Sequence, residues 1–203
     1  MKILKIEAAA LCAFIICLFI STYNLDKSCD SIRDGILRLH IIAASDSERD
    51  QSIKLKLRDE ILLKGKEIFS SSKTKADAQE KIKEHLDEVK KDAESFLKEN
   101  GYPPQVKVSL EKSFFSTRKY ESFTLPAGIY DALKIVIGKG EGENWWCVMF
   151  PALCVPAAEN PDEALDAILN EKQKEIITSE KYEIRLWFVE KWQKIRASIM
   201  YND

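Results

Sequence analysis

The feature that most constrains this chain is an uncharged run close to its amino terminus. Thirteen consecutive residues, Ala8 to Ile20 (AAALCAFIICLFI), carry no charge, and Lys2 and Lys5 precede them. A helix that crosses a bilayer needs about 20 apolar residues, so this run is short for a stable span. Its length and flanks are typical of the hydrophobic region of a signal peptide, although no clear small-residue cleavage site follows. We therefore expect residues 1–22 to be a signal peptide or membrane anchor that directs export, with a buried core helix as the alternative.

The overall charge argues against a nucleic-acid partner. The 203 residues include 31 Lys and Arg against 33 Asp and Glu, which gives a net charge of -2. Phosphate binding needs a clustered basic excess, and this chain has none overall. A hydrophobic content of 45% with 32% charged residues is ordinary for a folded protein and too apolar for a disordered one.

Export would place the later cysteines in an oxidising compartment. Cys147 and Cys154 are separated by six residues, including Pro151. Closing such a short loop with a disulfide would remove about 2–3 kcal/mol of unfolded-state entropy. We predict this disulfide, with two buried free thiols as the alternative. A zinc site would have too few ligands because no His lies nearby, so we expect no metal site.

The periodicity of apolar residues predicts one strand, two helices, several strands and then further helices. Residues 36–42 alternate as a strand does, and Ser47 has the form of an N-cap for a helix that reaches about Phe69. A second helix is predicted from Thr74 to the Asn100-Gly101 pair, which is typical of a left-handed helix end. Later segments are predicted as strands at 106–111, 114–120, 132–137 and 145–150, with a flexible glycine-rich connection at 138–143, and as helices at 160–177 and about 184–199.

This order of elements predicts an α+β fold. We expect a mainly antiparallel or mixed sheet packed by helices, preceded by the export segment and followed by C-terminal helices. The domain would cover residues 34–156, and residues 157–203 would form a helical extension. Trp187 and Trp192 lie on the apolar stripe of the last helix, where core packing is favoured over an interface with a partner or a membrane surface.

The residues offer little for catalysis. A cysteine nucleophile would be Cys147, with His40 as its base and Asp46 or Asp50 as the orienting group. The glycines at 138–142 match a phosphate loop weakly, because no helix follows to supply N–H groups. We expect no catalytic residues and no cofactor, and keep an exported cysteine-dependent hydrolase that uses Cys147 and His40 as the alternative function. A structural envelope component is a further option.

Two blocks of the sequence resemble the stage II sporulation protein R family. The resemblance runs from about Ile36 to Cys154 and departs from the family pattern at Ala44, where Asn is expected. The blocks are residues 39–51 (LHIIAASDSERDQ) with 54–59 (KLKLRD), and residues 123–130 (FTLPAGIY) with 138–151 (GKGEGENWWCVMFP).

The resemblance implies an exported signalling protein of endospore formation rather than an enzyme. Family members are made in the forespore and exported into the space between the forespore and mother-cell membranes. There they activate a membrane-embedded aspartic protease, which then cleaves the pro-form of the mother-cell sigma factor. Residues 1–22 would add a membrane contact if they are not removed.

Two segments are candidates for contact with that partner. One is the glycine-rich loop with the aromatic residues after it, and the other is the junction between the first strand and the next helix. The alternatives are that the two Trp are core residues on opposite sheet faces and that the junction is only a satisfied turn. The candidate residues are Glu143, Asn144, Trp145 and Trp146 in the first segment and His40, Asp46 and Gln51 in the second.

Overall fold

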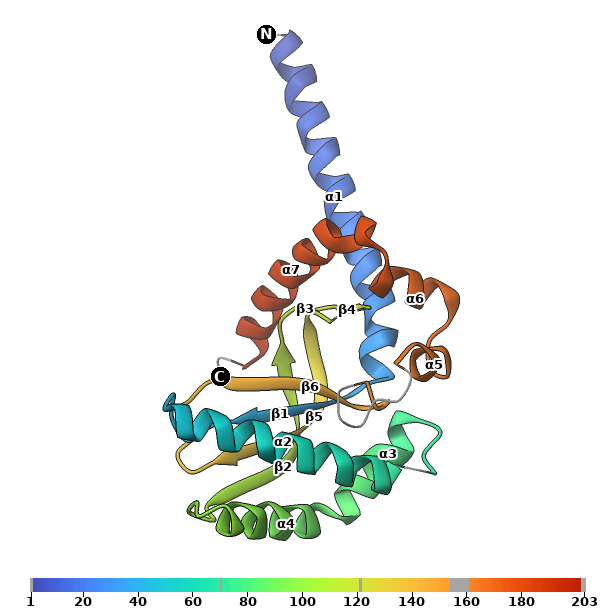
Figure 1. Ribbon diagram of the computed structural model, residues 1–203. Coiled ribbons are helices and arrows are strands. Elements are labelled where there is room, and N and C mark those ends of the chain that lie inside the picture. The colour runs from blue at the N-terminus through green and yellow to red at the C-terminus, as the bar shows by residue number, and fades with distance from the viewer. Residues whose placement is uncertain (1, 70, 121, 154–160, 202–203) are drawn as a thin grey trace. The chain divides into compact units, whose positions relative to one another are not determined.

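The chain folds into an α+β structure with a mixed sheet, helices and an apolar N-terminal helix, which confirms the predicted fold class. The computed structural model describes residues 2–69, 71–120, 122–153 and 161–201 (Figure 1). The predicted domain limit at residues 156 and 157 lies outside these residues. The elements belong to two units, one comprising residues 1–33, 116–128 and 171–203 (unit 1) and the other residues 34–115 and 129–170 (unit 2).

Unit 2 is built around a four-stranded sheet with the order β2-β5-β1-β6. The central strand β1 pairs in parallel with β5 and antiparallel with β6, so the sheet is mixed. β6 is therefore an edge strand, as is β2 at the other side. The strands are β1 (Leu37–Ile42), β2 (Val106–Phe115), β5 (Gly128–Ile137) and β6 (Asn144–Phe150).

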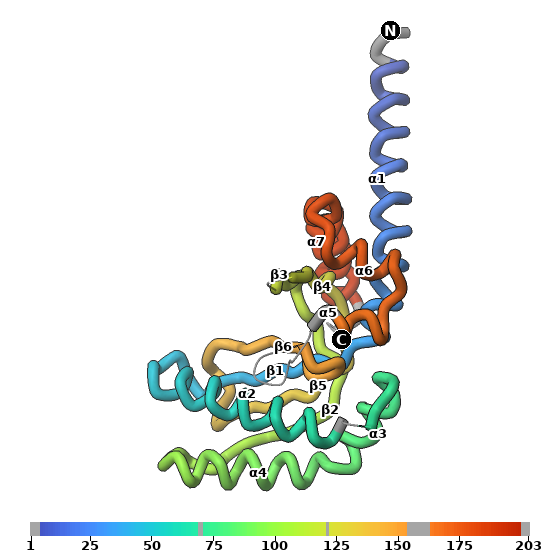
Figure 2. The backbone as a smooth tube through the Cα atoms, turned by 45° about the vertical axis from the view of Figure 1, so that its right-hand side comes forward, coloured from blue at the N-terminus to red at the C-terminus, as the bar shows by residue number. Residues whose placement is uncertain are grey.

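Three helices of unit 2 lie on one face of this sheet (Figures 1 and 2). Because strand side chains alternate between the two faces, every second residue of β1 points toward these helices. Leu37, Leu39 and Ile41 are fully buried, as is Leu57 of the first helix. The helices are α2 (Glu48–Phe69), α3 (Lys75–Glu84) and α4 (Leu86–Glu99), and a short helix, α5 (Pro161–Asp166), follows the sheet.

The second predicted helix is interrupted at His85. This residue has a ψ of 9°, and its backbone N–H still donates to the carbonyl oxygen of Lys81. The break separates α3 from α4, and both helices contact α2. Thr74 caps α3 through a reciprocal pair of hydrogen bonds with Asp77. The chain leaves α4 through Gly101, whose φ of +66° is the left-handed conformation that the sequence predicts.

Unit 1 contains two long helices and a small ribbon. α1 (Lys2–Asp34) has 33 residues and extends well beyond the apolar run. The helix predicted at 160–177 is replaced by two short helices, α5 and α6 (Glu171–Thr178), of which α6 belongs to unit 1. The 3-10 turn η1 (Glu180–Tyr182) and the long helix α7 (Glu183–Tyr201) follow. The ribbon pairs β3 (Arg118–Lys119) with β4 (Thr124–Leu125).

A buried polar cluster joins the segments of unit 1. The carboxylate of Asp26 accepts hydrogen bonds from Arg33 at 2.6 Å and from the side-chain amide of Gln193 at 2.8 Å. Arg33 also donates to the carbonyl oxygen of Ala127 at 2.7 Å. A Cβ atom at Gly128 would lie 2.6 Å from Cδ of Arg33, so glycine leaves room for this side chain. Replacing Arg33 would leave the buried carboxylate of Asp26 without its cation, and breaking a buried ion pair in this way costs about 3–5 kcal/mol in proteins.

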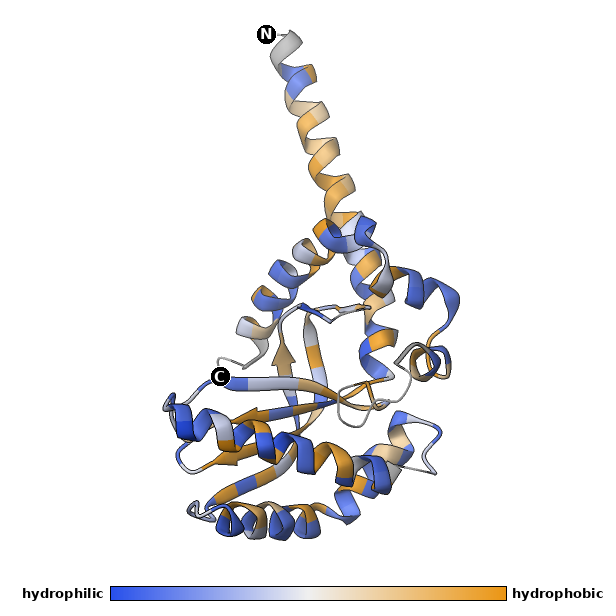
Figure 3. Ribbon diagram, in the orientation of Figure 1, coloured by the Kyte–Doolittle hydropathy of each residue, from blue (hydrophilic) through white to orange (hydrophobic). Residues whose placement is uncertain are grey.

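The apolar residues at the start of α1 and along one side of α7 are exposed. The segment Lys5–Asp34 is long and apolar enough to cross a membrane by length and composition, a test that a signal sequence also passes. Figure 3 shows the hydrophobic colour over the N-terminal half of α1. Trp187 and Trp192 are 53% and 40% exposed, so the prediction that favoured core packing for them is wrong. The buried face of α7 consists of other residues, including Leu186 and Val189.

Candidate functional site

The pairing of β1 with β6 brings the two predicted contact segments together. In this antiparallel pair, His40 lies opposite Trp146, Ile41 opposite Trp145 and Ile42 opposite Asn144. The C-terminal end of β1 and the beginning of β6 therefore adjoin, and α2 begins only a few residues after β1. We call the surface formed by His40, Asp46, Gln51, Lys54, Glu143, Asn144, Trp145 and Trp146 the junction surface.

The glycine-rich connection is fastened to the turn after β1. The backbone N–H of Gly142 donates to the carbonyl oxygen of Ala43 at 3.0 Å, and that of Glu141 donates to Ala44 at 3.3 Å. A Cβ atom at Gly142 would lie only 2.3 Å from the carbonyl oxygen of Ser45. The prediction of a flexible connection is therefore corrected, because glycine is needed here for close backbone approach. Ala44, where the sequence departs from the family pattern, takes part through its backbone.

A polar side chain in the turn before α2 adds to this attachment, and one in the first turns of α2 holds the turn itself. Oδ1 of Asp46 accepts a hydrogen bond from the backbone N–H of Glu143 at 2.6 Å. The side-chain amide of Gln51 donates to the carbonyl oxygen of Ser45 at 2.9 Å. The bond between Asp46 and Glu143 joins the two predicted segments, which are about 90 residues apart in the sequence, into one surface.

Lys54 is a member of this surface that the site prediction missed. Its Nζ donates to Oε1 of Gln51 at 2.5 Å and to the carbonyl oxygen of Glu143 at 3.0 Å. The side chain is buried, and burial lowers the pKa of Lys54, while the charges of Glu143 and Asp46 oppose that shift. The sequence could have predicted its burial. Lys54 precedes Leu57 by three residues and Ile61 by seven, so helical spacing places it on the buried stripe of α2.

Asp50 anchors the beginning of α2 to the end of α4. Its carboxylate accepts hydrogen bonds from the hydroxyls of Tyr102 at 2.6 Å and Ser45 at 2.7 Å. The hydrogen bond from Tyr102 is the main reason why the pKa of Asp50 lies below its usual range. Burial, together with Asp50, raises the pKa of Tyr102 to about 12. The backbone N–H of Asp50 donates to Oγ of Ser47, which is the predicted N-cap.

His40 lies on the sheet face opposite to the helices. Its Nε2 is 2.7 Å from Oδ1 of Asn144, and because that oxygen can only accept, Nε2 carries the hydrogen. The ring centroid is 6.0 Å from those of Trp146 and Phe115. Burial lowers the pKa of His40 despite the hydrogen bond to Asn144, so the imidazole is neutral at pH 7. Its buried Nδ1 has no hydrogen-bond partner within the described part of the chain.

The two adjacent tryptophans point to opposite faces of the sheet. Trp146 lies beside His40, whereas Trp145 lies on the helix side with the guanidinium carbon of Arg58 4.5 Å from its ring centroid. Both indoles are half-buried. No flat sheet face presents both, and β6, the strand that carries them, is at the edge of the sheet.

The pairing does not form the candidate catalytic dyad. Cys147 lies opposite Leu39, and His40 lies opposite Trp146. Residues directly opposite in an antiparallel pair share a face, so Cys147 and His40 point to opposite faces of the sheet. Cys147 is also only 2% exposed. Its predicted disulfide partner, Cys154, lies outside the described residues, so that pairing stays a prediction.

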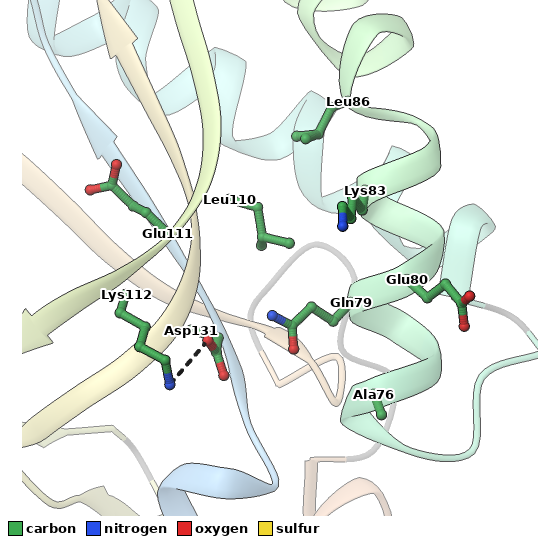
Figure 4. A pocket seen from close by; sticks show the side chains of 9 residues that line it. All are labelled: Ala76, Gln79, Glu80, Lys83, Leu86, Leu110, Glu111, Lys112 and Asp131. Carbon is green, nitrogen blue, oxygen red and sulfur yellow. Dashed lines mark ion pairs between the residues drawn. The ribbon is translucent and has the colours of Figure 1, made fainter.

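A separate hollow of about 570 Å³ lies between α3 and the strands β2 and β5 (Figure 4). None of the predicted site residues lines it. Its charged residues include Asp131, which pairs with Lys75 at 2.6 Å and with Lys112 at 3.6 Å. Over the residues that the structure describes, no three His, Cys, Asp or Glu side chains are grouped to hold a metal ion.

Fold and site together define an α+β protein with an apolar N-terminal helix suited to a membrane or to export. Residues 33–160 match the family model of stage II sporulation protein R. A curated relative of that name from Bacillus subtilis (strain 168) is 38% identical over 126 residues, which are 61% of this chain and 55% of the relative. The chain therefore belongs to the stage II sporulation protein R family, and this membership supports a role in sporulation.

The alignment covers little more than half the length of that relative. No solved structure matches the chain. The family assignment agrees with the resemblance carried by the two sequence blocks, and both blocks lie within the matched residues.

Proposed function

We propose that this protein is an intercompartment signal of endospore formation. It is exported from the forespore into the space between the forespore and mother-cell membranes, where it activates a membrane-embedded aspartic protease. The protease then processes the pro-form of the mother-cell sigma factor. The junction surface is the part of the signal that recognises the protease.

One observation carries this proposal. The two blocks that resemble the family are far apart in the sequence, yet their residues interlock through Gly142, Asp46 and Lys54 into one surface. Burying a lysine costs free energy unless its ammonium group is hydrogen-bonded, and Lys54 donates to the side-chain amide oxygen of Gln51 and to the carbonyl oxygen of Glu143. A turn that only connects two elements does not require such a residue. The apolar α1 is compatible with export or anchoring of such a signal.

A ligand activates a protease only by favouring its active state. It must bind the active arrangement more tightly than the inactive one, or bring two copies of the protease together. A preformed surface serves the first route, because little ordering entropy is lost when the surface docks. The hydrogen bonds that hold the glycine-rich connection supply this preorganisation.

The alternative of an exported cysteine-dependent hydrolase has lost its geometric basis. Its proposed nucleophile Cys147 and base His40 point to opposite faces of the sheet. A base must lie within hydrogen-bond reach of its nucleophile, at about 2.6–3.2 Å. The signalling role is therefore the function that the site supports best.

The test is deletion of the gene in its spore-forming host, followed by an immunoblot of the mother-cell pro-sigma factor. We expect processing to stop, and to return with the full chain but not with a copy that lacks residues 1–21. A second complementing copy carries Cys147→Ser alone, which would inactivate a cysteine-dependent hydrolase but leaves the residues of the junction surface unchanged, and we expect it to restore processing. Normal processing in the deletion strain would refute the proposed role.

A further inference from the structure

α7 carries two different apolar faces. Leu186, Val189 and Gln193 are at most 3% exposed and form the face that packs inside unit 1. The opposite side repeats apolar residues at helical spacing, and all of them are exposed. This outer stripe consists of Ile184, Trp187, Phe188, Trp192, Ile195 and Ile199, with exposed fractions from 40% to 74%.

The outer stripe continues onto the apolar run of α1. Both helices belong to unit 1, and Phe188, Trp192 and Ile195 line a groove of about 530 Å³ together with residues Ile15 and Phe19 of α1. At the other end of the contact, Arg185 donates a hydrogen bond to Oγ of Ser21 at 3.1 Å. The two helices therefore form one continuous apolar surface.

The position of the contact along α1 fixes the depth of α7 relative to a bilayer. The uncharged run ends at Ile20, and Ser21 is the first polar residue after it. If the run lies in the hydrocarbon, then Ser21 and Tyr23 lie at the headgroup level, and the beginning of α7, where Arg185 contacts Ser21, lies beside them. Tryptophan is enriched at that level because its ring is apolar and its N–H is polar.

The charges of α7 suit an anionic lipid surface. The helix has four basic residues, Arg185, Lys191, Lys194 and Arg196, against two acidic ones, Glu183 and Glu190. Lys191 lies within the outer stripe, with its Nζ 5.1 Å from the ring centroid of Trp187. A long side chain of this kind lies along apolar surface and extends its charge to the headgroups.

We propose that the outer stripe of α7 lies in the interface of an anionic phospholipid bilayer, with acyl chains filling the groove between α7 and α1. Unit 1 is then a membrane-docking module in which α7 lies on the bilayer that α1 enters. This inference does not depend on the proposed signalling role.

The four tryptophans of the chain make the test direct, because two lie on α7 and two on β6. The full chain is reconstituted into vesicles of phosphatidylcholine and phosphatidylglycerol that contain lipids brominated in the upper acyl chain, which quench nearby indoles. The Trp145→Phe, Trp146→Phe variant reports only Trp187 and Trp192, and the Trp187→Phe, Trp192→Phe variant is the matched control.

We expect the α7 tryptophans to emit at a shorter wavelength and to lose about half or more of their emission, because the apolar face of an interfacial helix is buried ~5–10 Å into the boundary between headgroups and acyl chains. The control variant should show no quenching. If the first variant fails to fold, the difference between the wild-type chain and the control gives the same quantity. Ile195→Glu should reduce the quenching, whereas Thr178→Glu, which adds the same charge on α6, should leave it unchanged.

Emission of Trp187 and Trp192 at the wavelength of water-exposed indole, with no quenching by brominated lipid, would overturn the proposal. A shift that depends on protein concentration and is insensitive to brominated lipid would also overturn it, and would assign the outer stripe to a second copy of the chain.

Discussion

Lys54 and His40 show how burial sets the charge of single residues in the junction surface. Lys54 keeps its ammonium group close to two neutral oxygens, and burial lowers its pKa. His40 is held as the neutral imidazole by its surroundings. Both residues lie where the two sequence blocks meet. Substituting them therefore tests how this surface contributes to the free energy of unfolding and to its dependence on pH.

Replacing Lys54 should destabilise unit 2. Lys54→Met removes two hydrogen bonds of a buried side chain and leaves the carbonyl oxygen of Glu143 with only the longer bond from the backbone N–H of Ala43, at 3.4 Å. This loss should lower the free energy of unfolding by about 1–2 kcal/mol. Lys56→Met is the matched control, because Lys56 is exposed on the same helix and should change stability by less than about 0.5 kcal/mol. Denaturant unfolding of the purified variants measures both, and equal effects would contradict the role given to Lys54.

His40 should make the fold sensitive to mild acid. Its pKa is lowered below the value of 6.5 that it has when unfolded, so the unfolded chain binds more protons as the pH falls through this range. Stability from neutral His40 is complete above pH 6.5 and declines below it, by at most about 1.4 kcal/mol per pH unit. His40→Gln should remove this slope between pH 6.5 and 5.5 when unfolding is followed by circular dichroism. An unchanged slope would show that His40 is not responsible.

Among the elements, the connection between β5 and β6 shows most clearly where sequence reasoning stops. Its glycines suggest freedom, because glycine allows many backbone conformations. Gly142 instead lies in a tightly packed position, because a side chain there would collide with the carbonyl oxygen of Ser45 across the junction. Only the pairing of β1 with β6 reveals that neighbour, and pairing between distant segments is not encoded in a local pattern.

Gly142→Ala should therefore be more harmful than a substitution at a glycine that has open space around it. The added Cβ would lie 2.3 Å from the Ser45 oxygen, which forces backbone movement and should cost about 2–3 kcal/mol. Gly101→Ala meets no atom within 4 Å and bears only the strain of its φ of +66°, about 1–2 kcal/mol. Thermal unfolding of both variants gives the order, and a smaller loss for Gly142→Ala would contradict the close packing described here.

Elements with strong local signals could be predicted from the sequence. The N-cap at Ser47, the start of α3 at Thr74 and the left-handed end at Gly101 all follow from short-range chemistry. The break at His85 was missed because the apolar spacing continues through it. The exposed stripe of α7 was misjudged because periodicity shows that a face is apolar but not what covers it.

For the whole molecule, the predicted disulfide between Cys147 and Cys154 is a test of the compartment. An exported chain should carry this bond, because oxidising compartments favour it. Alkylation of the unfolded protein before and after reduction, followed by mass spectrometry of the peptides, should label Cys147 and Cys154 only after reduction. Labelling of both without reductant would contradict the bond.

If the junction surface delivers the signal, as we propose, reversing the charge of Glu143 in the variant Glu143→Lys should abolish signalling. The side chain of Glu143 is exposed, while its backbone N–H and carbonyl hold the junction, so reversing the charge alters the surface and keeps those contacts. Glu80→Lys is the matched control, because Glu80 is an exposed acid on α3 and is outside the junction surface. Each variant replaces the wild-type gene in the spore-forming host, and processing of the mother-cell pro-sigma factor is followed by immunoblot at equal protein levels. We expect Glu143→Lys to block processing and Glu80→Lys to leave it unchanged. Wild-type processing with a stably folded Glu143→Lys protein would contradict it.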